Sequence, residues 1–406
     1  MRKLCCTMIV LFFVSVSNVW ADEAEKDFVS LFDGKTLTGW VKRGGDATYH
    51  VDGDCIVGVV ADQERNTFLC SEKIYENFVF KAQFKFDKPF NSGIQFRSNA
   101  SPDGARERVF GYQYEMDTDR MTAAVYDEAR RDRWVDPLTE EVQQKSKDAF
   151  KVGDWNDVTI QCVGPSIKTY LNGVKISDIM DTADTKGFFG LQVHAANSPG
   201  QVRWKNIRVK ELPKSSWQSF FDPKKPLDTY LEVKPAGKWT MDENGVVYAV
   251  SESAERRDGL VLSKENYPNV VAKITFKQEQ GNSGLYFRAT PIDKPHWVKG
   301  IQNEIDALAT GGIWEVEGRG WLAPPDKEKI QKVFKPNEWN ELSLVAIDGH
   351  IVTILNGTEI SNINDDQVVR DGKLGLQLHG SNNMGYWFKD FEAMQVTPEM
   401  VKLIQE

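Results

Sequence analysis

Apolar and polar residues alternate along much of the chain beyond residue 28. In residues 78–86, Phe and Ala occupy every second position, and Val, Lys and Gln fill the positions between them. Successive side chains of a strand point to opposite faces, so this alternation predicts strands with one buried face. The Asn172-Gly173 pair between two further apolar runs is typical of a tight hairpin turn. Many short strands with frequent turns predict an all-β chain, with antiparallel sheets packed face to face.

The strand pattern occurs twice, because the second half of the chain repeats the first. Five short motifs recur in the same order, at 91–97 and 282–288, 111–117 and 300–306, 155–156 and 339–340, 171–173 and 355–357, and 190–194 and 375–379. Repetition of this kind indicates a duplicated domain. We therefore predict one β-sandwich over residues 28–212, a second over residues 217–397, and a C-terminal tail over residues 398–406.

Three of these motifs place polar side chains on one face of each predicted sandwich. If their strands are neighbours in one sheet, the outward face of the first copy carries Gln95, Arg97, Gln113, Glu115, Asp117, Gln192 and His194. The same face of the second copy carries Tyr286, Arg288, Gln302, Glu304, Asp306, Gln377 and His379. Amides, carboxylates and guanidinium groups bond well to hydroxyl groups, so the face suits a sugar. The alternative interpretation is an ordinary solvated surface.

The segment after the carboxylate strand supplies further candidate residues. Residues 126–134 and 310–321 each combine aromatic, acidic and arginine side chains. An aromatic ring offers a flat apolar surface, and charged groups beside it offer hydrogen bonds. The candidate sugar contacts are Tyr126, Arg130 and Trp134 in the first copy and Arg319 in the second. A packed tryptophan beside a solvated ion pair is the competing interpretation.

The N-terminal segment differs from both copies. Arg2 and Lys3 precede a mostly apolar run, and Val19-Trp20-Ala21 resembles a signal-peptidase site. We expect residues 1–21 to be a signal peptide cleaved near Ala21, and the protein to be periplasmic or secreted. The apolar run is shorter than the ~20 residues that span a bilayer, so we expect no integral membrane segment after cleavage.

Charge and cysteine content narrow the classes of partner. The net charge is −9 and no basic block occurs, which argues against a nucleic acid partner. Beyond the signal peptide the chain has three cysteines, Cys55, Cys70 and Cys162, an odd number without a zinc-binding spacing. Either Cys55 and Cys70 form a disulfide, or all three are buried thiols.

Several segments of the first copy are typical of one known family. They are the opening Leu31-Phe32-Asp33-Gly34-Lys35-Thr36-Leu37-Thr38-Gly39-Trp40, segments 91–97, 110–117, 126–131, 171–173 and 190–194, and the ending 202–207. With them the chain resembles the 3-keto-disaccharide hydrolase domain family. The second copy departs from the pattern at residues 220–224, and the first departs at residues 122–124, where members usually carry two glycines. The resemblance implies a concanavalin A-like jelly roll in each copy and activity on sugars oxidised at carbon 3.

A ketone at carbon 3 makes the proton on carbon 2 acidic, because the resulting enolate is delocalised. Loss of that proton expels the glycosidic oxygen from carbon 1, and water then adds back. The reaction needs a base, a group that stabilises the enolate and a proton donor. The resemblance suggests His194 or Glu115 as base and Asp117 as the residue that orients it. The enolate is then stabilised by Arg131 or Arg97, or by a divalent metal on Glu115, Asp117 and His194. The alternative function is non-catalytic, lectin-like carbohydrate binding.

Overall fold

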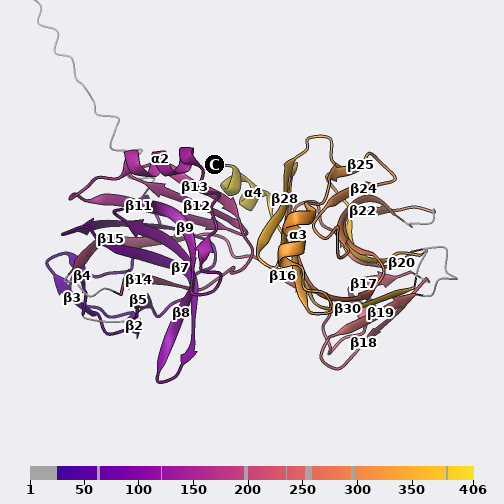
Figure 1. Cartoon of the computed structure of the whole chain (residues 1–406), viewed down its shortest axis with the longest axis horizontal. Helices are drawn as coiled ribbons and strands as arrows, with labels where there is room; N and C mark the ends of the chain where they lie inside the picture. Colours follow the sequence, from indigo (N-terminus) through magenta and orange to yellow (C-terminus); the bar gives the residue numbers. More distant parts are fainter. Residues whose placement is uncertain are drawn as a thin grey trace, which may run out of the picture.

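The structure is a computed structural model that describes residues 25–61, 65–119, 121–195, 200–234, 236–251, 258–293, 298–380 and 383–406. Two β-sandwiches follow one another along the chain, as Figure 1 shows. The predicted all-β fold class and the duplication are thereby confirmed. The expected signal peptide lies outside the described residues.

Each layer of the first sandwich is a broad antiparallel sheet. One sheet has the order β13 (Val174–Met180), β12 (Ser166–Leu171), β11 (Asn156–Val163), β6 (Phe78–Phe86), β15 (Gln201–Glu211), β4 (Cys55–Val59) and β3 (Thr48–Asp52), and β1 (Val29–Ser30) also pairs with β15. The other has the order β10 (Arg133–Trp134), β9 (Thr122–Glu128), β8 (Arg106–Asp117), β7 (Asn91–Asp103), β14 (Phe188–Val193), β5 (Thr67–Ser71) and β2 (Trp40–Gly44). Helix α2 (Glu140–Ala149) lies between β10 and β11 in the chain.

The second sandwich repeats this arrangement. One sheet has the order β18 (Lys238–Met241), β19 (Val247–Ser251), β30 (Met384–Gln395), β21 (Val270–Gln280), β26 (Asn340–Ile347), β27 (His350–Leu355) and β28 (Thr358–Asn364), with β16 (Trp217–Ser219) paired to β30. The other has the order β17 (Leu231–Val233), β20 (Gly259–Asn266), β29 (Lys373–Leu378), β22 (Ser283–Pro291), β23 (Val298–Ile305), β24 (Ile313–Val316) and β25 (Gly320–Ala323). The short helices are η1 (Leu227–Thr229) and α3 (Lys327–Val333).

The alternation in the sequence explains the cores. Along β6 every second residue is buried, which puts its Phe rings and Ala82 between the two sheets. Burial of a large apolar side chain contributes roughly 1.5–3 kcal/mol, so one such strand anchors its sheet firmly. The predicted hairpin joins β12 and β13, and Asn172 and Gly173 both have positive φ, at 51° and 83°. This matches the demand of a tight turn for left-handed backbone.

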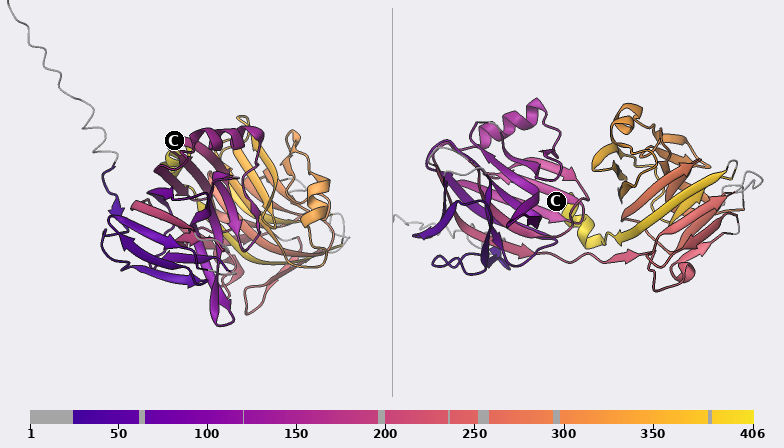
Figure 2. Two further views of the ribbon diagram at one scale, coloured as in Figure 1. Left: turned by 60° about the vertical axis from the view of Figure 1, so that its left-hand side comes forward. Right: turned by 60° about the horizontal axis from the view of Figure 1, so that its bottom comes forward.

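The C-terminal tail joins the two sandwiches. It forms helix α4 (Pro398–Gln405), whose Met400, Val401 and Ile404 are buried in an apolar cluster with residues of both copies. The Lys168 ammonium and the Gln161 amide donate to the carbonyls of Ile404 and Leu403, at 2.6 and 2.9 Å. Figure 2 shows α4 between the sandwiches, which one extended segment connects.

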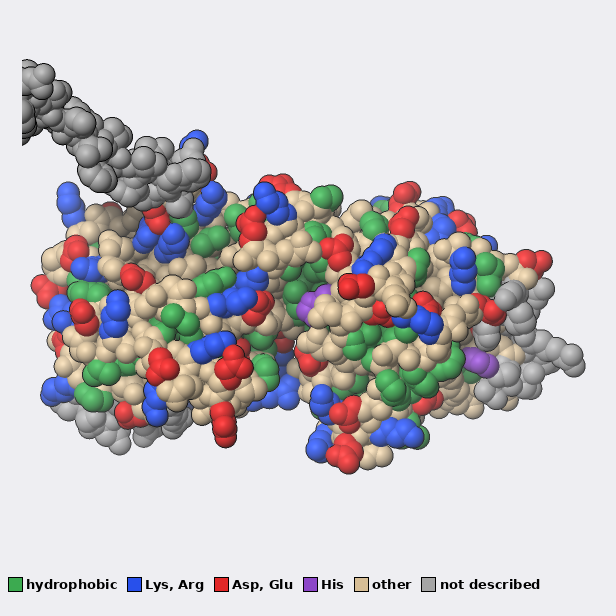
Figure 3. All heavy atoms as spheres, turned by 90° about the horizontal axis from the view of Figure 1, so that it is seen from above, with side chains coloured by type: hydrophobic (Ala, Val, Ile, Leu, Met, Phe, Trp, Pro, Cys, Tyr) green, Lys and Arg blue, Asp and Glu red, His purple; other side chains and the backbone are tan. Residues whose placement is uncertain are grey.

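Charged side chains of both signs are mixed on the surface (Figure 3), and the three cysteines of the described part are buried. Lys and Arg side chains are interspersed with Asp and Glu across the face in Figure 3. Cys55, Cys70 and Cys162 are buried free thiols, so the disulfide considered between Cys55 and Cys70 is not formed. Among the described residues, no helix has the length and apolar character needed to cross a membrane.

Candidate functional site

The candidate site lies on the outer face of the first sandwich, over strand β8. Glu115 points outward from β8, yet only 7% of it is exposed. Its two carboxyl oxygens accept hydrogen bonds from Asn91 Nδ2 at 2.7 Å and Gln113 Nε2 at 2.8 Å. Burial raises the pKa of Glu115 to about 7, against these two hydrogen bonds. Such a carboxyl group exchanges its proton near neutral pH, as a catalytic acid or base must.

A second carboxyl group faces the same space from the neighbouring strand. Glu128, at the end of β9, accepts a hydrogen bond from Asn66 Nδ2 at 2.9 Å. Burial raises its pKa, and the charge of Glu128 in turn raises the pKa of Glu115. Two like charges in one poorly hydrated site disfavour each other's ionisation. The pair therefore holds a proton more readily than either acid does in water.

These two acids line a cavity of about 260 Å³. The cavity is also lined by Asn66, Asn91, Gln113, Tyr126, Asp132, Trp134 and His194. This volume is near the lower end of the ~300–1,000 Å³ typical of small-molecule sites. The rings of Tyr126 and Trp134 meet edge to face, with centroids 5.3 Å apart, and form an aromatic wall. Acids, amides and an aromatic wall in one cavity suit a single polyhydroxylated ring.

His194 contributes an imidazole to this cavity. Its Nδ1 lies 2.7 Å from the carbonyl oxygen of Ala195, and only a protonated nitrogen bonds to a carbonyl oxygen. Neutral His194 therefore presents Nε2 as a hydrogen-bond acceptor. The main-chain N–H of Ala195 donates to Asn66 Oδ1, at 2.8 Å. Asn66 thus bonds both to Glu128 and to the residue after His194, and it holds the two sides of the cavity together.

The predicted glutamines form a buried layer beneath Glu115. Gln95 Nε2 donates to Gln113 Oε1 at 2.8 Å, and Gln113 Nε2 contacts Gln192 Oε1 at 3.4 Å. All three are 1% exposed or less. The structure thus brings together the three strands assumed to be neighbours. The three amides lie below the cavity and hold Glu115 in place through Gln113, which is the one of the three that lines the cavity.

Asp117 lies at the end of β8 and supports the site through Asn91. Asn91 Nδ2 donates to Asp117 at 2.9 Å as well as to Glu115, and the main-chain N–H of Asp119 donates to Asp117 at 2.8 Å. Asp306 in the second copy accepts from the main-chain N–H of Leu308 at 3.0 Å. The recurrence of this aspartate in both copies therefore also has a structural reason, since Asp often closes a turn in this way.

The residues proposed for a metal do not fit one. Among the residues that the structure describes, no group of three or more His, Cys, Asp or Glu side chains is placed to hold a metal ion. Glu115 is bonded to Asn91 and Gln113, Asp117 closes a turn, and His194 turns Nδ1 to the main chain. We derive no step through a metal.

The prediction that Arg97 shares the polar face is wrong. Pairing between β7 and β8 shifts after Phe96, and Arg97 has a φ of 47°, so its side chain leaves the outer face. The fully buried guanidinium donates to the carbonyl oxygens of Glu76 and Gly164, at 2.8 and 2.7 Å. Arg288 has the same backbone conformation, with a φ of 51°, and likewise donates to main-chain carbonyls. Both arginines tie loops together.

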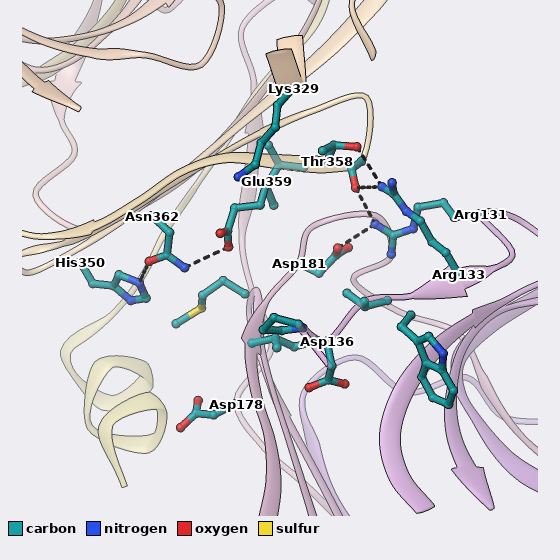
Figure 4. Close-up of a pocket in the computed structure, with 17 residues that line it drawn as sticks. Arg131, Arg133, Asp136, Asp178, Asp181, Lys329, His350, Thr358, Glu359 and Asn362 are labelled. Carbon is teal, nitrogen blue, oxygen red and sulfur yellow. Dashed lines mark hydrogen bonds and ion pairs between the residues drawn. The ribbon is translucent and has the colours of Figure 1, made fainter. Parts of the chain in front are cut away.

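Arg130 and Arg131 also lie away from the cavity. Both pair with the buried Asp127, Arg130 pairs in addition with Asp184, and Arg131 donates to Asp181 at 2.8 Å. Figure 4 shows Arg131 pointing toward Asp181 in a different pocket, at the junction of the two copies. The role of Arg131 as enolate stabiliser therefore lacks the geometry it requires.

The second copy lacks one acid of the pair. Glu304 keeps the setting of Glu115: it is buried, accepts from Asn282 at 3.2 Å, and burial raises its pKa to about 7. Gly111 pairs with Glu128, but its counterpart Gly300 pairs with Val316. Val316 belongs to an apolar cluster on this face. The second copy therefore has a valine where the first has its second acid.

The other candidate residues of the second copy have surroundings similar to those of their counterparts in the first. Gln302 donates to Gln377 at 3.1 Å, and Gln377 donates to Asp258 at 2.6 Å. Arg319 is bonded to Glu315 and Asp365, matching the pairs of Arg131 with Asp127 and Asp181. His379 follows β29 at the position equivalent to His194. The aromatic wall is kept as Trp314 and Trp321, with centroids 5.1 Å apart.

Sequence reasoning missed Glu128, Asn66 and Asn91 as site residues. Glu128 stands two positions after Tyr126 on one strand, so alternation alone would have placed both on one face. Asn91 recurs as Asn282 in the duplication, and this recurrence in a polar motif could have indicated a role in the site. Asn66 lies outside every repeated motif, and only the pairing of β5 with β14 brings it near His194.

Comparison with known proteins identifies a family. A sequence model of the 3-keto-alpha-glucoside-1,2-lyase-like domain matches residues 27–210 and 216–394. No curated protein matches the chain significantly. Similar solved structures include a Parabacteroides distasonis protein described as a glycosyl hydrolase (21% identity, covering 44% of this chain and 98% of that one, TM-score 0.33). Another is the carbohydrate binding module CBM66 from Bacillus subtilis (17% identity, 44% and 98% covered, TM-score 0.33).

Proposed function

Because the chain belongs to the 3-keto-alpha-glucoside-1,2-lyase-like family, with one domain in each half, we propose that its first copy cleaves 3-keto-glycosides. One observation carries the proposal: Glu115, with a pKa of about 7, lines a cavity of ring size together with a second acid, Glu128. A base that works near neutral pH needs a pKa near 7. The family also supports a carbohydrate as the partner.

The reaction proceeds by elimination. Glu115 takes the proton from carbon 2, and the electrons of that C–H bond form an enolate with the carbon 3 ketone. The enolate collapses into a double bond between carbons 1 and 2, and the bond from carbon 1 to the glycosidic oxygen breaks. The leaving oxygen takes a proton from Glu128, whose pKa burial raises above its ordinary value. The products are an unsaturated keto sugar and an alcohol. Water added to carbon 1 then completes hydrolysis.

The enolate oxygen needs a hydrogen-bond donor. Tyr126 lines the cavity, and burial raises the pKa of its phenol, which keeps the hydroxyl protonated and able to donate. Tyr126 therefore replaces Arg97 and Arg131 in this role. His194 accepts a hydrogen bond from a sugar hydroxyl through Nε2 and orients the ring.

The second copy is better suited to binding than to catalysis. It keeps the buried acid and the aromatic wall, but Val316 stands in place of the second acid. Without a proton donor at that place, expulsion of an alkoxide is slow. We therefore assign a carbohydrate-binding role to the second copy.

The test compares a nitrophenyl 3-keto-glucoside with the ordinary nitrophenyl glucoside. Purified protein should release nitrophenol from the keto substrate only, and deuterium at carbon 2 should slow the release. Glu115→Gln should abolish release, while the matched variant Glu304→Gln should retain it. Cleavage of the ordinary glucoside at equal rate would refute elimination. Sugar binding without any release would favour the lectin-like alternative for both copies.

A further inference from the structure

Three hollows follow one another along β8 and the residues after it, and the candidate site is the middle one: Glu107 and Val109 line the first, Gln113 and Glu115 the second, and Asp119 and Met121 the third. The first, about 320 Å³, lies toward the long β7–β8 hairpin that extends from the sandwich in Figure 1. The third, about 590 Å³, lies toward α2. Glu107, Gln113 and Glu115 are an even number of residues apart on β8, so they face the same side of the sheet.

The hollows are neighbours, because they share lining residues. Asn66, Glu128 and Asp132 line both the hairpin-side hollow and the central cavity. Trp134 lines both the central cavity and the helix-side hollow. At ~3.4 Å per residue, the stretch of β8 from Glu107 to Asp117 is about 34 Å long, so it extends well beyond one ring.

We infer that this groove binds an extended glycan, with the 3-keto unit in the central cavity and further sugar units on both sides. The inference rests on the proposed function and names its substrate class. A site for a single small glycoside would be closed on at least one side. Here the cavity that holds the acids has a further hollow beside it on each of two sides, and each shares lining residues with it.

The two outer hollows have surfaces suited to sugars. The helix-side hollow combines the apolar Trp134, Met121 and Leu138 with the polar ends of Gln143, Gln144 and Lys147. The hairpin-side hollow combines Phe68 and Val109 with the charged Arg65, Glu107 and Arg108. Sugars present apolar faces and hydroxyl edges, so the Trp134 ring and the polar groups around each hollow are the surfaces that would contact them, while Phe68, Val109 and Met121 are at most 3% exposed and lie beneath.

The chemistry also limits the linkage. Carbon 3 of the reacting unit carries the ketone, so the chain cannot continue through that position. Carbon 1 carries the bond that breaks, and a further sugar on the oxygen of carbon 2 would crowd the base that removes the neighbouring proton. A unit inside a chain therefore continues most simply through the oxygen on carbon 4 or carbon 6. The predicted substrate is a 1,4- or 1,6-linked glucan fragment with one oxidised unit.

The experiment measures kcat/KM for 1,4-linked and 1,6-linked gluco-oligosaccharides of increasing length, each with one 3-keto unit, against the nitrophenyl 3-keto-glucoside. One linkage series should gain at least about tenfold with length, since each added hydrogen bond of ~0.5–1.5 kcal/mol is worth roughly two- to tenfold. Arg108→Ala and the double variant Gln143→Ala/Lys147→Ala should reduce that gain. Lys145→Ala is the matched control, because Lys145 is on α2 but pairs with Glu141 outside the hollow.

The outcomes separate this inference from the proposed function. A value of kcat/KM that stays constant with length in both series, and is unaffected by the groove variants, overturns the extended groove but leaves elimination standing. If no keto substrate is cleaved, the proposed function fails, and calorimetry with unoxidised oligosaccharides then tests the groove alone. Affinity that rises with length and falls in the groove variants supports the groove. Affinity independent of length overturns it.

Discussion

Replacing Glu115 by Gln should abolish activity and, at neutral and higher pH, stabilise the protein. The carboxylate is the base of the proposed reaction, and loss of general base catalysis typically lowers kcat about 10²–10⁴-fold. The same carboxylate is charged and buried above its pKa of about 7, which disfavours the folded state. Gln has a similar shape and carries no charge, so it removes this penalty along with the base, while its single amide oxygen accepts from only one of the two donors Asn91 and Gln113.

The magnitude follows from linkage. The folded-state pKa of Glu115 is raised from 4.5 to about 7, so the folded protein holds this proton more tightly than the unfolded chain. This contribution to stability is fully present below pH 4.5 and is lost as the pH rises through about 7. At ~1.4 kcal/mol per pKa unit, the loss is about 3 kcal/mol. Glu115→Gln does not titrate, so its stability relative to the wild type should increase by about this amount.

Denaturant unfolding of both proteins at several pH values from 4.5 to 8 measures the difference. Other buried acids such as Glu304 and Asp136 titrate in both proteins and cancel. For the wild type, kcat/KM should rise about tenfold per pH unit toward pH 7, because the base must be ionised, and should fall again at higher pH as the proton donor Glu128 loses its proton. A stability difference that does not change with pH would show that Glu115 has an ordinary pKa, and would refute the reasoning.

Three further predictions concern other parts of the molecule. Glu128→Gln should lower kcat about 10²-fold or more by removing the proton donor, and the loss should be smaller with a nitrophenol leaving group than with an alcohol. Arg97→Met should leave the buried carbonyls of Glu76 and Gly164 without a donor and destabilise the fold by about 3 kcal/mol, measured by denaturant unfolding. Deletion of residues 398–406 exposes three buried side chains worth ~1.5–3 kcal/mol each and should separate the sandwiches, as measured by small-angle scattering.

Each of these has a control in the chain itself. The substitution Val316→Glu gives the second copy an acid at the position equivalent to Glu128. For Glu128 itself, Glu128→Asp keeps an acid and Glu128→Gln does not, so equal losses of kcat in the two variants would argue against proton donation. If Arg97→Met unfolds at the same denaturant concentration as the wild type, the loop-tying role fails. Lys402→Ala changes an exposed residue of α4, and it should leave the scattering profile unchanged. An unchanged profile after the deletion would show that α4 does not hold the sandwiches together.

The sequence alone determined the layers and the duplication of this protein. Alternation is a local property, because each residue of a strand faces opposite to its neighbour. It therefore placed the Phe rings of β6 in the core and Glu115 on the outer face. The Asn-Gly pair needs left-handed backbone at a turn, which is equally local. The family could be identified because its segments are continuous in the chain.

Only the tertiary structure decided which polar groups share the cavity. Arg97 follows the alternation in the sequence, yet a bulge in the pairing of β7 with β8 turns it into a buried loop contact. Arg131 is held by Asp181, which lies 50 residues further along the chain. Asn66 directly precedes β5 and Glu128 ends β9, and the two meet in one hydrogen bond. Bulges, ion pairs and strand order depend on long-range contacts, which the pattern within one strand does not contain.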